Sequence, residues 1–141
     1  MPPASAVFLD LASVDRGDLD LATLHRAAGP WATFPQTPAE LTAARIADAA
    51  VVVTNKVVID RAVMAACPGL RLVCVAATGT NNVDLVAAGE RGVAVCNVTG
   101  YATPSVVQHV LALMLALTTR LAEHAAAARD GRWAASDLFC L

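Results

Sequence analysis

The sequence predicts an α/β fold in which helices cover a doubly wound parallel sheet. Three features predict it: five short apolar runs along the chain, segments of helical periodicity between them, and Gly or Pro at their boundaries. The runs are apolar throughout instead of alternating, which is typical of strands buried on both faces of a parallel sheet. We therefore expect one such domain with both faces of its sheet covered.

The first half of the chain supplies three of the expected strands and two of the helices. Gly29 and Pro30 end the first helix, and Thr37 followed by Pro38 is typical of an N-cap with proline at the first helical position. The expected strands are 6–9, 31–34 and 50–53, and the expected helices are 18–28 and 39–49.

The second half continues the same alternation. Pro68 and Gly69 end one short helix, and Gly92 ends another. The expected helices are 59–67 and 82–91, and the expected strands are 70–76 and 93–96. Five strands that alternate with helices predict a flavodoxin-like sheet in the order 2-1-3-4-5.

A long helix is expected after the last strand, over residues 103–130. Thr103 and Pro104 favour its start. Between Val106 and Leu117 it is apolar on nearly every side, so one side can contact its own sheet while another needs a partner outside this sequence. The 57% hydrophobic content of the chain, above the usual content of about 45–50%, agrees with such a partner.

Charge and hydropathy argue against two classes of partner. The formal net charge is −2 and no Lys/Arg cluster is present, so we expect neither nucleic acid nor an anionic membrane to bind. The longest apolar helix candidate falls short of the ~20 residues that a membrane span needs. The N-terminus has no basic region followed by a long apolar run, so we expect no signal peptide and a cytoplasmic protein.

The four cysteines have no Cys-x-x-Cys spacing. Cys74 and Cys96 fall inside apolar strand runs, and we expect the cysteines to be reduced core residues. The four are Cys67, Cys74, Cys96 and Cys140. No His has metal-ligand spacing with a Cys or a carboxylate, so no metal site is expected.

Candidate binding groups follow three of the expected strands, at 54–56, 78–81 and 97–103. Ligands of open parallel sheets collect beyond the carboxyl ends of the strands. The segment 73–84 is predicted to form a strand, a tight turn and the start of a helix. The helix start would leave free N–H groups that can bind a small carboxylate. The expected substrate-binding residues are Thr78, Gly79, Thr80, Asn55 and Lys56, with Asn81 as a further hydrogen-bond donor. The alternative interpretation is that residues 78–81 form an ordinary turn without a ligand and that Lys56 is a solvated cap.

The chain offers no evident proton-transfer apparatus. His25 and His124 are expected to be structural or solvated, whereas His109, beside Gln108, could face a cleft or a covering domain. No Ser-His-Asp arrangement is apparent, and the eight glycines never form the dinucleotide fingerprint Gly-x-Gly-x-x-Gly.

Three segments carry a resemblance to a known family. They are AATGTNNVD at 76–84, GVAVCNV at 92–98 and YATPSVVQH at 101–109. Together they closely resemble the D-isomer-specific 2-hydroxyacid dehydrogenases, and in particular the glycerate dehydrogenase (hydroxypyruvate reductase) branch. The likeness extends from about Val51 to Leu141. Gln108 occupies a position that is commonly acidic in the family, and the glycerate dehydrogenase branch shares the glutamine.

The resemblance implies an NAD- or NADP-dependent oxidoreductase that acts on a small 2-hydroxy or 2-keto acid and forms a homodimer. It implies a flavodoxin-like substrate-binding domain over 1–102, an interdomain helix over 103–130, and over 131–141 the start of the connection to a Rossmann domain outside this sequence. Backbone amides at Thr78 and Gly79 would hold the substrate carboxylate, with Thr78 and Thr103 near the cofactor. The catalytic Arg, Glu and His of the family would lie beyond Leu141, so we expect the 141-residue chain to be the N-terminal part of the enzyme and inactive alone.

Two other readings remain open. One is a stand-alone flavodoxin-like binding or receiver-type signalling module. Asp10 fits a receiver, but Thr54-Asn55 and Asn97 do not supply the carboxylate and Lys that one needs. The other is a regulatory chain that binds intact subunits through its apolar helix.

Overall fold

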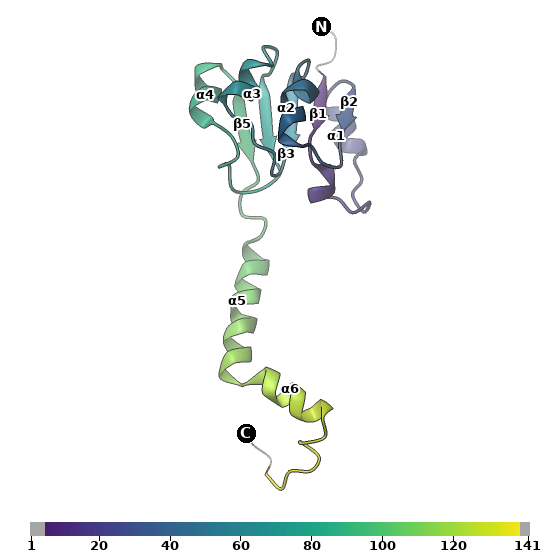
Figure 1. Cartoon of the computed structure of the whole chain (residues 1–141), viewed down its shortest axis with the longest axis vertical. Coiled ribbons are helices and arrows are strands. Elements are labelled where there is room, and N and C mark those ends of the chain that lie inside the picture. The colour runs from purple at the N-terminus through teal and green to yellow at the C-terminus, as the bar shows by residue number, and fades with distance from the viewer. Residues whose placement is uncertain (1–4, 139–141) are drawn as a thin grey trace. The chain divides into compact units, whose positions relative to one another are not determined.

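The computed structural model describes residues 5–138 and divides the chain into two compact units, 1–99 and 100–141 (Figure 1). The first unit contains the whole sheet, and the second contains two helices.

The first unit is built on a five-stranded sheet in which every pairing is parallel. The strands are β1 (Ala6–Phe8), β2 (Trp31–Thr33), β3 (Val51–Thr54), β4 (Leu72–Val75) and β5 (Ala94–Asn97). Their order is β2-β1-β3-β4-β5, which confirms the predicted topology. Crossovers between parallel neighbours require the intervening helices, as the alternation of the sequence indicated.

The helices of this unit are shorter than the sequence predicts. They are the 3₁₀ turn η1 (Leu11–Ser13), α1 (Ala22–Ala27), α2 (Ala39–Ile46), α3 (Arg61–Ala65) and α4 (Leu85–Glu90). The helix expected from residue 18 begins four residues later because the Asp15 carboxylate accepts the N–H groups of Gly17, Asp18 and Leu19 and holds them in a turn.

The expected N-cap of α2 is also wrong. Pro38 occupies the cap position and no side chain caps the helix. The Thr37 hydroxyl instead donates a hydrogen bond to the Leu9 carbonyl, 28 residues earlier in the chain. A capping residue therefore serves here to fasten the start of α2 to the end of β1.

The core lies between one face of the sheet and α2, α3 and α4, which share that face (Figure 1). Alternate residues of the strands point into it, among them Val52 and Val73, both fully buried. The side chains of this core are Val7, Leu9, Ile46, Ala49, Val52, Ile59, Met64, Cys67, Leu70, Val73, Val75, Ala77, Val83, Ala87, Ala88 and Val93.

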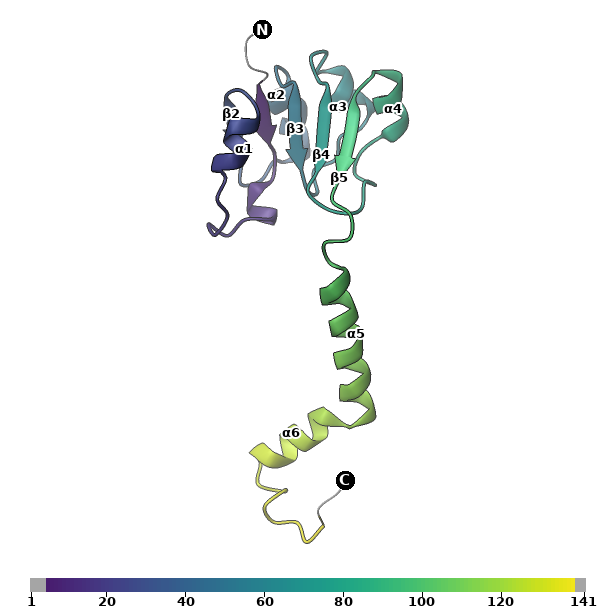
Figure 2. The same cartoon turned by 180° about the vertical axis from the view of Figure 1, so that it is seen from behind.

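The opposite face departs from the expectation that both faces are covered. Within residues 5–99, α1 lies on this side next to β1 and β2, and no helix lies over β3, β4 and β5 (Figure 2). In consequence Leu72 and Cys74 of β4 are only half-buried, and Ala94 and Cys96 of β5 are exposed. Cys96 is therefore not the core residue that its apolar neighbours suggested.

The second unit corrects the prediction of one continuous helix over 103–130. It contains α5 (Thr103–Thr118) and α6 (Leu121–Arg129), whose axes differ by 66°. The hydroxyls of Thr118 and Thr119 donate to the Leu115 carbonyl, and Arg120 follows in the left-handed region at φ 52°. Threonine side chains compete here for the carbonyls of the last turn, and a left-handed residue then ends the helix.

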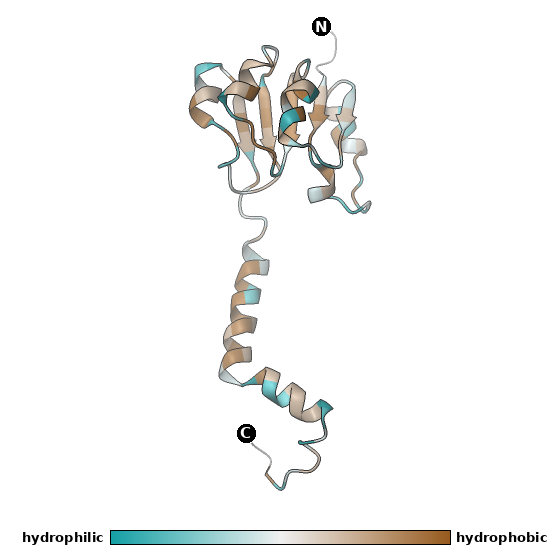
Figure 3. Cartoon of the chain, viewed as in Figure 1, coloured by the Kyte–Doolittle hydropathy of each residue, from teal (hydrophilic) through white to brown (hydrophobic). Residues whose placement is uncertain are grey.

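Most residues of the α5 helix are hydrophobic, as the largely brown ribbon of this helix in Figure 3 shows. None of its residues is buried, and it begins after Ala102 without a side-chain cap, so Thr103 is its first residue and not its N-cap. No single helix in the described residues is long and apolar enough to cross a membrane. Taken together, the bent pair α5 and α6 has the length and the apolar composition of a membrane span.

Candidate functional site

The candidate site lies at the carboxyl edge of the sheet, where the chain leaves β3 and β4. Because all five strands are parallel, the loops after them share one edge. Two of these loops enclose a cavity of about 240 Å³, lined by Asn55, Lys56, Val58, Ala77, Gly79, Asn81 and Asn82. The structure thus brings together Asn55, Lys56 and Gly79, three of the five predicted substrate-binding residues, whereas Thr78 and Thr80 flank the cavity without lining it.

The β3 loop is fastened by a buried carboxylate. Asp10, two residues after the end of β1, accepts hydrogen bonds from the Asn55 N–H at 2.9 Å and the Lys56 N–H at 2.6 Å. These two N–H groups are therefore occupied and are not available to a ligand. The Asn55 amide already donates to the Ser13 hydroxyl at 3.1 Å, while Lys56 is exposed.

Sequence reasoning did not assign Asp10 to this site. The available signal was an acidic residue directly after an apolar strand, at the sheet edge where ligand loops gather. Its role in the structure is to orient the loop that carries Lys56, because a charge-assisted hydrogen bond to a backbone N–H is stronger than a neutral one.

The β4 loop is braced by the last residue of β5 and the residue that follows it. The Thr78 hydroxyl donates to the Val98 carbonyl at 2.9 Å, and the Asn97 amide donates to the Thr78 carbonyl at 2.7 Å. The Val98 N–H in turn donates to the Ala77 carbonyl at 3.1 Å. Asn97 is thus a positioning residue, and the Thr78 side chain is engaged within the protein.

The N–H groups of the β4 loop remain available. Among the residues that the structure describes, no hydrogen bond uses the backbone N–H of Thr78, Gly79 or Thr80. Consecutive free N–H groups in a turn form a concave anion-binding feature. The arrangement can hold a small carboxylate, with the exposed Lys56 ammonium on the facing loop as a source of positive charge.

One part of the predicted geometry is wrong: these N–H groups do not stand at a helix N-terminus. The Thr80 carbonyl accepts the Val83 N–H in a turn, and α4 begins only at Leu85. Its N-terminus is already capped by the Asp84 carboxylate, which accepts the Ala87 N–H at 2.8 Å. Any anion affinity must therefore come from the loop itself and not from the α4 dipole.

Gly79 lies close to a side chain that lines the cavity but needs no special backbone conformation. Its φ lies outside the left-handed region, and a Cβ built on it would lie 3.1 Å from the Asn81 Oδ1. A side chain at this position would therefore require the Asn81 amide to shift by a few tenths of an ångström, and Asn81 also lines the cavity. The absence of a side chain lets the loop backbone and the Asn81 amide face the same space.

The floor of the cavity is tied to the core by backbone hydrogen bonds. The Ile59 N–H donates to the Asn82 carbonyl at 2.8 Å, and the Asp84 N–H donates to the Ile59 carbonyl at 3.0 Å. The Asn82 amide donates to the Val57 carbonyl at 3.0 Å. Because the Ile59 side chain is fully buried, the β3 and β4 loops are held at a fixed spacing.

The three histidines belong to helices and not to the loops that line the cavity. His25 is exposed on α1, with its ring 6.1 Å from that of Trp31, and the His124 ring on α6 meets that of Trp133 edge-on at 6.4 Å. His109 and Thr103 both belong to α5 in the second unit. Within residues 5–138, no group of three His, Cys, Asp or Glu side chains is placed to hold a metal ion.

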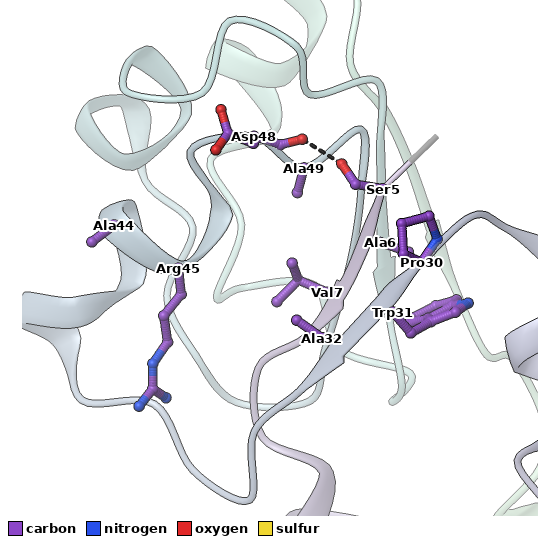
Figure 4. Close-up of a pocket in the computed structure, with 10 residues that line it drawn as sticks. All are labelled: Ser5, Ala6, Val7, Pro30, Trp31, Ala32, Ala44, Arg45, Asp48 and Ala49. Atoms are coloured by element: carbon purple, nitrogen blue, oxygen red, sulfur yellow. Dashed lines mark hydrogen bonds between the residues drawn. The ribbon is translucent and has the colours of Figure 1, made fainter. Parts of the chain in front are cut away.

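A second cavity, of about 270 Å³, lies between β1, β2 and α2 (Figure 4). Two of its polar side chains already have partners: the Ser5 hydroxyl donates to the Asp48 carbonyl, and the Arg45 guanidinium donates to the Gln36 carbonyl and the Thr37 hydroxyl. The indole N–H of Trp31, which also lines this cavity, is buried without a partner among the described residues. This cavity lies beside the amino ends of β1 and β2, whereas ligands of open parallel sheets bind beyond the carboxyl ends of the strands, so we assign the candidate site to the cavity at the carboxyl edge.

Comparisons with known proteins agree with this architecture. The sequence profile of the D-isomer specific 2-hydroxyacid dehydrogenase catalytic domain matches residues 11–136. A hydroxypyruvate reductase of Blautia hydrogenotrophica is 36% identical over 137 residues, which cover 95% of this chain and 42% of that protein. A glycerate dehydrogenase of Methylorubrum extorquens is 36% identical over 134 residues, with the same coverage of both chains.

A 2-hydroxyacid dehydrogenase of Ketogulonicigenium vulgare has a similar solved structure, with a TM-score of 0.78 and 28% identity. The match covers all of this chain and 44% of that one. The chain thus spans less than half the length of the relatives it matches. On the profile match and these relatives, the chain belongs to the D-isomer specific 2-hydroxyacid dehydrogenase family.

Proposed function

We propose that the protein to which this sequence belongs transfers a hydride between a nicotinamide cofactor and a small 2-hydroxy or 2-keto acid of the glycerate and hydroxypyruvate class. The observation that carries the proposal is the cavity at the carboxyl edge, with free N–H groups at Thr78, Gly79 and Thr80 and with Lys56 on the facing loop. The relatives named hydroxypyruvate reductase and glycerate dehydrogenase support the substrate class.

The part of this chain in that reaction is to hold and orient the substrate carboxylate. Loop N–H groups would donate to the carboxylate oxygens, and the Lys56 ammonium would add charge without fixing direction. The Asp10 and Asn97 hydrogen bonds hold the two loops in place before the substrate arrives. Such preorganisation fixes where the adjacent 2-carbon lies relative to a hydride donor.

The described residues do not form a dinucleotide cradle. A nicotinamide dinucleotide binds a glycine-rich loop before a helix N-terminus, and no Gly-x-Gly-x-x-Gly occurs in the sequence. A solved relative from Sinorhizobium meliloti is titled an NADPH-dependent glyoxylate/hydroxypyruvate reductase, and its likeness to this chain, at 22% identity and a TM-score of 0.73, concerns the fold. In this proposal a Rossmann domain outside this sequence binds the cofactor, and Thr78 and Thr103 are the residues of this chain that contact it.

The remaining parts of the proposal follow from the same assignment. The domain limits stay at 1–102, 103–130 and 131–141, although the middle segment is two helices. The full-length protein would be a cytoplasmic homodimer, and light scattering of that protein tests the dimer. A monomer at micromolar concentration would contradict it.

Amide NMR titration tests the binding role on this chain. Glycerate or hydroxypyruvate should shift the Gly79 and Thr80 amide signals saturably, with a Kd on the order of 1 mM, a value typical of a weak two- or three-bond contact. Lys56→Met should weaken binding several-fold, and Lys56→Arg should restore most of it. Equal shifts by glycerol, which lacks the carboxylate, would overturn the assignment.

An activity assay tests the division of labour. The 141-residue chain, mixed with hydroxypyruvate and NADH or NADPH, should produce no loss of reduced cofactor above the uncatalysed rate, because it has no dinucleotide fingerprint. Turnover by this chain alone would show that the hydride-transfer groups lie within it.

A further inference from the structure

Two thiols lie side by side on the open face of the sheet. Cys74 of β4 and Cys96 of β5 are directly paired in the register of the two parallel strands. Their neighbours Val73, Val75 and Val95 point to the other face, into or against the core, so both cysteine side chains point away from it. Within residues 5–99, no helix covers this part of the sheet (Figure 2).

The spacing of paired strands suits a disulfide. Neighbouring strands lie about 4.7–4.9 Å apart, and the Cα atoms of disulfide-bonded cysteines usually lie about 4.4–6.8 Å apart. Directly paired residues of neighbouring strands therefore lie within the Cα separation that a disulfide needs. Burial raises the pKa of the Cys74 thiol, and the charge of the nearby Cys96 raises it further.

We propose that Cys74 and Cys96 form an oxidisable dithiol, which peroxides convert to an intrachain disulfide that links β4 to β5. Cys96 is the exposed member and Cys74 is half-buried, so peroxide reaches Cys96 first. Both cysteines are free in the structure, which is the reduced state.

The chemistry needs only the peroxide as oxidant. The Cys96 thiolate attacks one peroxide oxygen, the O–O bond breaks, and hydroxide leaves as Cys96 becomes a sulfenic acid. The Cys74 sulfur then attacks the Cys96 sulfur, the S–O bond breaks and the S–S bond forms. Two thiols and one H₂O₂ thus give one disulfide and two waters.

Both cysteines come shortly before residues of the candidate site in the chain. Cys96 precedes Asn97, whose amide holds the Thr78 carbonyl, and Cys74 lies on the strand that leads into the Thr78 loop. A covalent link between the two strands therefore acts on the base of the loop that carries the free N–H groups.

Peptide mapping of the full chain is the test. Cleavage after Lys and Arg puts each of the four cysteines in its own peptide, namely 62–71, 72–91, 92–120 and 133–141. After treatment with H₂O₂ and capping of the remaining thiols, we expect peptide 72–91 linked to peptide 92–120 in monomeric protein. Dithiothreitol should reverse the link. Buried Cys67, whose thiol donates to the Ile46 carbonyl, should escape oxidation and be recovered with the capping group attached.

A matched control moves one thiol along the same strand. The double variant Ala94→Cys, Cys96→Ser keeps four cysteines, the same face of the sheet and the same tryptic peptide, but pairs the new thiol with Leu72. With about 3.3 Å of rise per residue and about 4.8 Å between strands, the Cα of the new thiol lies roughly 8 Å from that of Cys74, beyond the reach of a disulfide, so the linked peptide should be lost. Equal linking in this variant, links dominated by peptide 133–141, or oxidation to sulfinic acid without any link would overturn the proposal.

Discussion

The two faces of the sheet are made of similar residues but have different surroundings. On one face α2, α3 and α4 enclose a continuous core, and Val52 and Val73 are fully buried. On the other face, Leu72 and Cys74 remain half-buried and Cys96 is exposed, although all three lie in equally apolar runs. Hydrophobicity therefore identified the strands but not which of their side chains the fold removes from water.

The enclosed face and the carboxyl edge of the sheet also differ in what they contribute, which is stability for the first and ligand-binding groups for the second. The enclosed face supplies most of the stability, because apolar burial is the main favourable term in folding. The carboxyl edge above it carries polar loops whose free N–H groups and exposed Lys56 stabilise nothing in the fold that the structure describes. Groups that are left unsatisfied by folding are the ones available to a ligand.

The largest expected effect comes from a substitution on the enclosed face. Leu9→Ala should lower the free energy of unfolding by about 2–5 kcal/mol, because Leu9 is fully buried and its loss leaves a cavity. Leu72→Ala, on the open face, should cost about 1 kcal/mol or less. Urea denaturation followed by circular dichroism measures both. Equal losses would show that the two faces are equally enclosed in solution.

The next effect tests how the carboxyl edge is fastened to the core. Asp10→Ala should lower the free energy of unfolding by about 1–3 kcal/mol, since the Asn55 and Lys56 N–H groups lose their acceptor. Asp10→Asn keeps one acceptor oxygen and should cost less. In the alanine variant the amide NMR signals of both loop residues should move. Unchanged stability together with unchanged signals would contradict the anchoring role.

A smaller effect is expected at the start of α4. Asp84→Ala removes the side-chain cap on the Ala87 N–H and should cost about 1 kcal/mol, whereas Asp84→Ser should retain most of the stability. Thermal unfolding of the three proteins gives the order. If serine proves no better than alanine, the carboxylate acts through its charge and not as a cap.

The smallest effect concerns the Arg61–Glu90 ion pair between α3 and α4, on the outer side of the enclosed face. The hydrogen bond from Arg61, helped by its charge, lowers the pKa of Glu90. A lowered folded-state pKa gives stability above the unfolded pKa, about 4.3, that is lost as the pH falls through the folded value. Both side chains are more than half exposed, so the contribution is small and screened by salt.

Glu90→Gln should therefore lower the Tm slightly at pH 7, and the difference from wild type should shrink as the pH falls through the lowered folded-state pKa of Glu90. Differential scanning calorimetry at low ionic strength measures the difference. A difference that grows as the pH falls would have the wrong sign for this pair.

Much of the site was predictable from the residues that follow each strand. Asn55, Lys56 and Gly79 were assigned from their places after the strands, and the structure brings them to one cavity. Asp10 was not assigned to the site, and Asn97 was included only as part of the 97–103 loop, because their roles are hydrogen bonds to backbone groups 45 and 19 residues away. No local pattern encodes such a partner.

The sequence by itself determined the five strands, their parallel order and the edge at which polar loops gather, because short apolar runs, breakers and crossover rules are local or topological. Only the tertiary structure decided that α4 begins at Leu85, that the chain bends at Arg120, and that Cys74 and Cys96 meet on an open face. Those features depend on side-chain hydrogen bonds, on strand register and on which elements cover a face. All three are settled by packing between distant segments and not by any stretch of sequence alone.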